Sequence, residues 1–70
     1  MEAEKLQKKL QKQIAKLRKE KNLTQEELAY KVGITPKALS DIENNRRNVS
    51  FKTFIKICIA LDVKIALEKE

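Results

Sequence analysis

Residues 23–44 read LTQEELAYKVGITPKALSDIEN, and this stretch decides the fold. Thr24, with Glu27 three positions later, forms a capping box, in which the threonine hydroxyl accepts from an amide of the first turn and the carboxylate reaches back to the cap amide. A helix is therefore predicted over residues 25–32. Gly33, the only glycine of the chain, stands where that helix would end in a left-handed residue.

A second helix start follows this glycine closely. Thr35 is a good N-cap and Pro36 is favoured at the first helical position, so a helix is predicted from Pro36 to about Asn44, where asparagine tolerates the left-handed conformation. Two short helices joined by a turn that contains glycine are a candidate helix-turn-helix, here over residues 25–44. The apolar residues that would let the two helices share one core are Leu28, Val32, Ile34, Leu39 and Ile42.

One further helix is predicted on each side of this motif. Apolar residues from Ala3 to Leu17 recur at helical spacing, which predicts a helix over residues 2–21. Ser50 caps another helix over residues 51–61. The side chains expected to fill the core from this last helix are Phe51, Phe54, Cys58 and Leu61, with help from Ile57.

The final residues, 63–70, alternate between apolar and polar side chains. Alternation indicates a strand, and the same residues give a poorer helical stripe. A lone strand cannot satisfy its backbone, so it would need a partner, most simply the same strand of a second subunit. The expected fold is all-α: one domain over residues 1–70, a compact four- to five-helix bundle with a long N-terminal helix, a basic extension over residues 1–13 and, as an option, a short C-terminal strand that pairs across a dimer.

The composition excludes several classes of function. The 70 residues contain no histidine, one cysteine and one glycine, so a zinc site, an internal disulfide, a histidine-based triad and a glycine-rich phosphate loop are all excluded. No apolar run reaches the length of a membrane span, and the N-terminus is too charged for a secretory signal. We expect a cytoplasmic protein that is not an enzyme and that uses no metal, cofactor or membrane.

The net charge of +6 is distributed unevenly. Residues 1–23 carry a net +5, residues 24–45 a net −2, and residues 46–70 a net +3. Basic segments on both sides of a weakly acidic middle suit a polyanionic partner. The alternative is that lysine-rich helices are simply well solvated, and composition alone does not separate the two interpretations.

The motif resembles the XRE, or Cro/C1-type, helix-turn-helix family, which includes phage repressors and antitoxins. The resemblance rests on Leu23–Ala29, Val32–Ile34 and Ser40–Asn44, and it covers about residues 12–62. It implies a lambda-repressor-like fold whose second motif helix enters the major groove of double-stranded DNA. The residues it implies for reading base edges are Pro36, Lys37, Ser40 and Asp41. The residues it implies for contacting phosphates are Gln25, Thr35, Asn44, Arg46 and Arg47.

The resemblance also implies a structural ion pair. We call the second motif helix the reading helix. The family often pairs an arginine of the first helix with a glutamate at the end of the reading helix, and Arg18 and Glu43 stand at the matching positions. We expect this pair to hold the reading helix in place. Two departures are that Asn45 stands where the family commonly has glycine, and that Pro36 is unusual at the start of the reading helix.

The function that follows is a sequence-specific DNA-binding transcriptional regulator, most simply a repressor, which associates with the nucleoid when bound. A single reading helix contacts few base pairs, so a homodimer on an inverted repeat is expected. The alternatives are an antitoxin, which binds a toxin protein and represses its own promoter, and a protein-interaction module. Candidate dimer or partner contacts are the surplus apolar residues Leu6, Leu10, Ile55, Ile59, Val63, Ile65 and Leu67. Cys58 is expected to be core filler.

Overall fold

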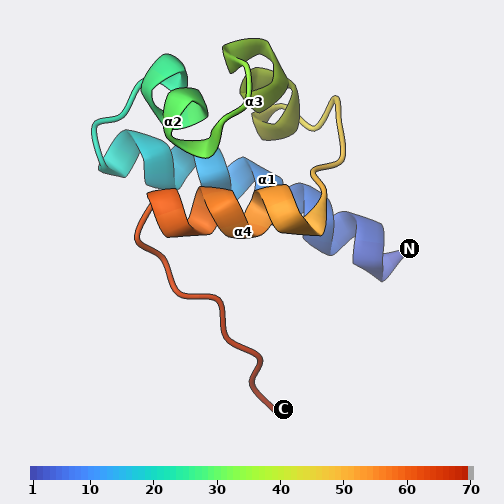
Figure 1. Cartoon of the computed structure of the whole chain (residues 1–70). Coiled ribbons are helices and arrows are strands. Elements are labelled where there is room, and N and C mark those ends of the chain that lie inside the picture. Colours follow the sequence, from blue (N-terminus) through green and yellow to red (C-terminus); the bar gives the residue numbers. More distant parts are fainter. Residues whose placement is uncertain (70) are drawn as a thin grey trace.

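A computed structural model describes residues 1–69 and contains four helices. They are α1 (Glu2–Glu20), α2 (Gln25–Val32), α3 (Pro36–Glu43) and α4 (Phe51–Ala60). Helices α2 and α3 form an upper layer over α1 and α4, and the chain after α4 leaves the body as an extended tail (Figure 1). The predicted all-α bundle is confirmed, and every helix boundary lies within one residue of its predicted position.

The helices begin at the caps that the sequence predicts. The hydroxyl of Thr24 accepts from the Glu27 amide at 3.0 Å, and the Glu27 carboxylate accepts from the Thr24 amide at 2.9 Å. This hydrogen bond from the Thr24 amide is the main reason why the pKa of Glu27 is lowered. The hydroxyls of Thr35 and Ser50 cap α3 and α4 in the same way. These local bonds set the positions of the two motif helices along the chain.

Left-handed residues follow all four helices. Gly33 has a φ of 85° after α2, and asparagine or aspartate takes the same role after the other three, at Asn22, Asn45 and Asp62, with φ between 58° and 60°. Asn45 therefore supplies the backbone conformation for which the family commonly uses glycine. The turn between α2 and α3 is short as a result, and the two helices share one core.

The core is built from all four helices. Its fully or nearly fully buried members are Ile14, Leu28, Ala29, Val32, Leu39, Ile42, Ile57 and Leu61. One sequence prediction is wrong here, because Phe51 is 74% exposed whereas Ile57 is completely buried. Phe51 is the first residue of α4 and lines an outer groove beside α1, so the buried face of α4 starts one turn later than predicted.

The C-terminal tail forms no strand in this single chain. Within residues 1–69 no strand is present, and Ile65 and Leu67 are exposed. A strand that pairs across a dimer requires the second subunit, so that prediction stays open. None of the helices in the described part of the chain combines the length and the apolar character that a membrane span needs.

Candidate nucleic-acid interface

Helix α3 presents two different faces. Ala38, Leu39 and Ile42 are buried against the other helices. On the opposite side Pro36 and Lys37 are exposed, as is Asn44 just after the helix, and Ser40 is half-buried. The outward face is therefore short, polar and free of large apolar side chains, and 84% of the Lys37 side chain is exposed on it.

Three cations converge on one carboxylate at this face. Arg46 Nε lies 3.1 Å from Asp41 Oδ1, while Lys37 Nζ and Arg47 Nη2 lie 3.6 Å and 3.9 Å from Oδ2. Asp41 is consequently less exposed than we expect of a residue that reads base edges, with 13% of its side chain accessible. The hydrogen bond from Arg46 is the largest of the effects that hold the pKa of Asp41 below its usual range. The cluster brings positive charge from the loop after α3 up to the helix itself.

We expect the contribution of Asp41 to stability to depend on pH. Because its folded-state pKa is lowered, the contribution is present above the unfolded pKa of about 4 and is lost as the pH falls through the folded value. The thermal midpoint of Asp41→Asn should lie below that of wild type at about pH 7, and the difference should be smaller at about pH 2. Asp62→Asn, which removes the same charge from an exposed side chain, is the control. An equal deficit of Asp41→Asn at both pH values would contradict the prediction.

The far end of α3 is held by a buried ion pair. Arg18 Nε lies 2.8 Å from Glu43 Oε2, a second bond joins Nη2 to Oε1 at 3.2 Å, and the two side chains are only 9% and 3% exposed. Arg18 also donates to the carbonyl of Leu23 at 2.7 Å, and Gln25 donates to Glu43 Oε1 at 2.9 Å. These are the two residues for which the sequence predicts pairing. The pair joins α1, the start of α2 and the end of α3 at one point.

The arrangement has a two-helix motif, an outward polar helix face and flanking arginines. Residues 14–67, more than half of the chain, match a family model described as Helix-turn-helix. The chain belongs to this family, the XRE helix-turn-helix proteins. This is a family of DNA-binding transcriptional regulators that also has antitoxins among its members.

Curated relatives support this assignment. Over 51 residues the chain is 41% identical to the antitoxin HipB of Escherichia coli O6:H1, a match that covers 73% of this chain and 54% of that protein. It is 42% identical over 52 residues to the uncharacterized HTH-type transcriptional regulator YqaE of Bacillus subtilis, covering 74% of this chain and 45% of that protein. The chain thus spans about half the length of these relatives.

The structure distributes the other predicted site residues unevenly around the XRE motif. The hydroxyl of Thr35 caps α3, and the side-chain amide of Asn44 donates to the Ser40 carbonyl at 2.9 Å. Gln25 lies at the first residue of α2, with its side chain turned to Glu43. Arg46 and Arg47 follow α3 directly and have more than half of each side chain exposed. Their contacts with DNA remain proposals.

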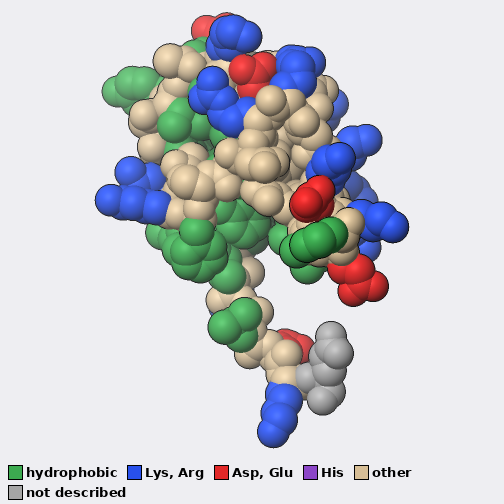
Figure 2. Space-filling model, turned by 90° about the vertical axis from the view of Figure 1, so that its right-hand side faces the viewer, with side chains coloured by type: hydrophobic (Ala, Val, Ile, Leu, Met, Phe, Trp, Pro, Cys, Tyr) green, Lys and Arg blue, Asp and Glu red, His purple; other side chains and the backbone are tan. Residues whose placement is uncertain are grey.

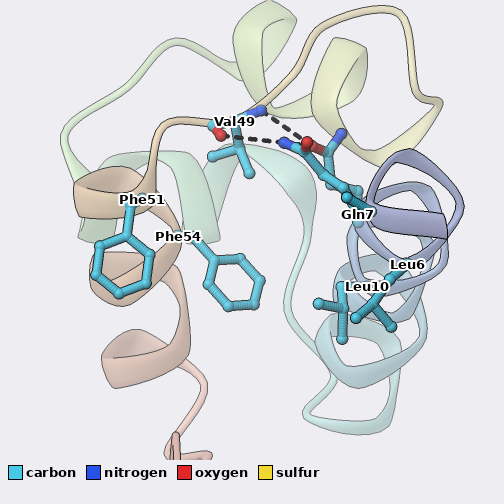
Figure 3. A pocket seen from close by; sticks show the side chains of 8 residues that line it. Leu6, Gln7, Leu10, Val49, Phe51 and Phe54 are labelled. Atoms are coloured by element: carbon cyan, nitrogen blue, oxygen red, sulfur yellow. Dashed lines mark hydrogen bonds between the residues drawn. The ribbon is translucent and has the colours of Figure 1, made fainter. Parts of the chain in front are cut away.

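The apolar residues considered for a dimer do not form a single surface. Leu6 and Leu10 line a groove between the start of α1 and the start of α4, together with Phe51 and Phe54 (Figure 3). Ile59, which is 70% exposed, lines a separate hollow at the other end of α4. Figure 2 shows Lys and Arg side chains spread over the face that includes the start of α1, with hydrophobic side chains exposed among and below them.

Sequence reasoning missed the polar side chains that α1 buries. Gln11 is 1% exposed and contacts the loop after α3, and the half-buried Gln7 joins it. Their four-residue spacing was a signal, since it places both side chains on one face of the helix.

Cys58 is buried in α4, and burial raises the pKa of its thiol. Among residues 1–69 no group of three acidic, cysteine or histidine side chains is arranged to hold a metal ion.

Proposed function

We propose that this chain is a sequence-specific double-stranded DNA-binding repressor that acts as a homodimer on an inverted repeat. The observation that carries the proposal is the exposed polar face of α3, with Lys37 and Ser40 flanked by Arg46 and Arg47. A helix of this diameter fits the major groove, where side chains reach base edges. Arg46 and Arg47 of the following loop, which lie beside Asp41 of α3, would contact phosphates.

The roles divide by chemistry. The ammonium of Lys37 can donate to guanine O6 and N7, and the Ser40 hydroxyl can donate or accept. Pro36 has no amide proton and would read the groove by shape or by contact with a thymine methyl. Asp41 can accept from cytosine N4, but it must first release Arg46 or share it.

A selection of random duplex DNA by the purified chain at about 150 mM salt tests the proposal. We expect an enriched inverted repeat whose half-sites lie about 10 base pairs apart. Lys37→Ala and Ser40→Ala should relax selection at defined positions, with a loss of about 1–3 kcal/mol for each base contact removed. Lys56→Ala, an exposed lysine of α4, should leave the enriched sequence unchanged. The proposal fails if no sequence is enriched, and a protein-interaction module then becomes the better interpretation.

A second function, antitoxin, is favoured by the 41% identity to the antitoxin HipB. Such a protein would bind a toxin protein and repress its own promoter through the same α3 face. Co-expression with the product of the adjacent gene distinguishes the two functions. An antitoxin should form a stoichiometric complex with that product, relieve its toxicity and keep its DNA sequence preference. A dedicated regulator should keep its DNA sequence preference but should neither form the complex nor relieve the toxicity.

A further inference from the structure

The loop between α3 and α4 is held by a side chain of α1 rather than by regular secondary structure. Gln11 Nε2 donates to the carbonyls of Ile42 and Arg47, at 2.9 Å and 2.8 Å, and to Asn45 Oδ1 at 3.3 Å. Its Oε1 accepts from the Val49 amide at 2.9 Å. One buried amide thus connects the last turn of α3 with both ends of the loop.

Gln7 extends this connection by one helical turn. Its Nε2 donates to Gln11 Oε1 at 3.1 Å and to the Val49 carbonyl at 3.3 Å. The Val49 backbone therefore makes one hydrogen bond with each glutamine, since its carbonyl accepts from Gln7 and its amide donates to Gln11, as Figure 3 shows from the side of the groove. We call Gln7, Gln11 and the loop of residues 45–49 the glutamine clamp. Both glutamines precede residue 14, where the match to the XRE family begins.

The bonds of the clamp hold the loop backbone on both sides of Arg46, whose own amide donates to the Asp41 carbonyl at 2.8 Å. Arg47 is held through its own carbonyl, and Arg46 lies between two clamped residues, Asn45 and Arg47. Because the same amide also bonds to Ile42 in α3, the loop and the reading helix are fixed relative to each other. A loop of this length without such bonds would leave its backbone groups to water and would sample many conformations.

We propose that Gln11, supported by Gln7, is a positioning residue for DNA binding, which holds Arg46 and Arg47 in register with the phosphates beside α3. This role rests on the proposed DNA-binding function. It gives the N-terminal extension a purpose other than charge, since its polar face holds part of the DNA interface without touching DNA. A role in folding alone would leave the number of phosphate contacts unchanged.

The test measures the salt dependence of DNA binding for Gln11→Ala and Gln7→Ala, at a temperature where circular dichroism shows each variant to be folded. The slope of log affinity against log salt counts phosphate contacts at about 0.9 per contact. We expect Gln11→Ala to flatten the slope by about 1–2, and Gln7→Ala to flatten it less. Gln13→Ala makes the same change at an exposed position of α1 and should keep the wild-type slope.

A second comparison shows whether the effect acts through the arginines. In a chain that already carries Arg46→Ala and Arg47→Ala, adding Gln11→Ala should flatten the slope no further. An unchanged slope for both glutamine variants, or the same additional loss in the chain without these arginines, would overturn the proposal. If Gln11→Ala does not fold, the slope of Gln7→Ala decides in the same way.

Amide hydrogen exchange without DNA separates this proposal from the function on which it rests. The Val49 amide, which donates to Gln11, should exchange slowly in the wild-type chain and faster in Gln7→Ala. Fast exchange in the wild type would overturn the clamp even if DNA binding is intact. If the wild-type chain binds no DNA, the proposed function and the positioning role fail together, and slow exchange would preserve the clamp as a structural element only.

Discussion

Replacing Glu43 with alanine is expected to lower the free energy of unfolding by about 3–5 kcal/mol. The side chain is 3% exposed and accepts from Arg18 and from Gln25. Its removal leaves the Arg18 guanidinium buried without its counter-ion, which is the costly outcome for a buried pair. A chain of 70 residues has a total stability of roughly 4–10 kcal/mol, so this variant should be close to unfolding at 25 °C.

Urea denaturation followed by circular dichroism measures this effect. Glu20→Ala is the matched control, because Glu20 is exposed at the end of α1, and it should change stability by less than about 0.5 kcal/mol. DNA binding of Glu43→Ala should weaken in proportion to the unfolded fraction. A Glu43→Ala protein as stable as the control would show that the pair does not hold α3.

Ile57→Ala should be nearly as damaging, at about 2–5 kcal/mol, whereas Phe51→Ala should cost less than about 1 kcal/mol. Both changes remove a large apolar side chain from α4, but Ile57 is fully buried and Phe51 is 74% exposed. Burial determines the loss, since a cavity forms only where neighbours surround the deleted atoms. The same denaturation experiment compares the two, and the reverse order of stabilities would mean that α4 is rotated relative to this structure.

The helix boundaries could be predicted from the sequence because the signals that set them are local. The Thr24 capping box, Gly33 and the Thr35-Pro36 start each act over a few residues, and the corresponding bonds are present. The burial of α4 could not be read in the same way. Its spacing allows both Phe51 and Ile57 to face inward, but only Ile57 is covered by the other helices, whereas Phe51 lines the groove beside the start of α1.

The candidate site also combines features that local patterns predict with features that depend on contacts between distant segments. The outward face of α3 follows from helical periodicity, apart from Asp41, which is covered by cations of the following loop. The contacts of Gln11 span 31 to 38 residues along the chain. Helical spacing separates it from Gln13, an exposed glutamine two positions away, but it does not show that the loop after α3 crosses the face on which Gln7 and Gln11 lie. Gln11 is buried and hydrogen-bonded to backbone groups because the loop passes over its side of α1.

The glutamine clamp has a reciprocal consequence. If the second and third turns of α1 restrain the loop, then a restrained loop must restrain those turns by the same free energy, because coupling between two sites is symmetric. Phosphates that fix Arg46 and Arg47 should therefore reduce fraying at the start of α1. The order of the N-terminal turns would then depend on whether DNA is bound. Part of the free energy of DNA binding would be spent on ordering the start of α1.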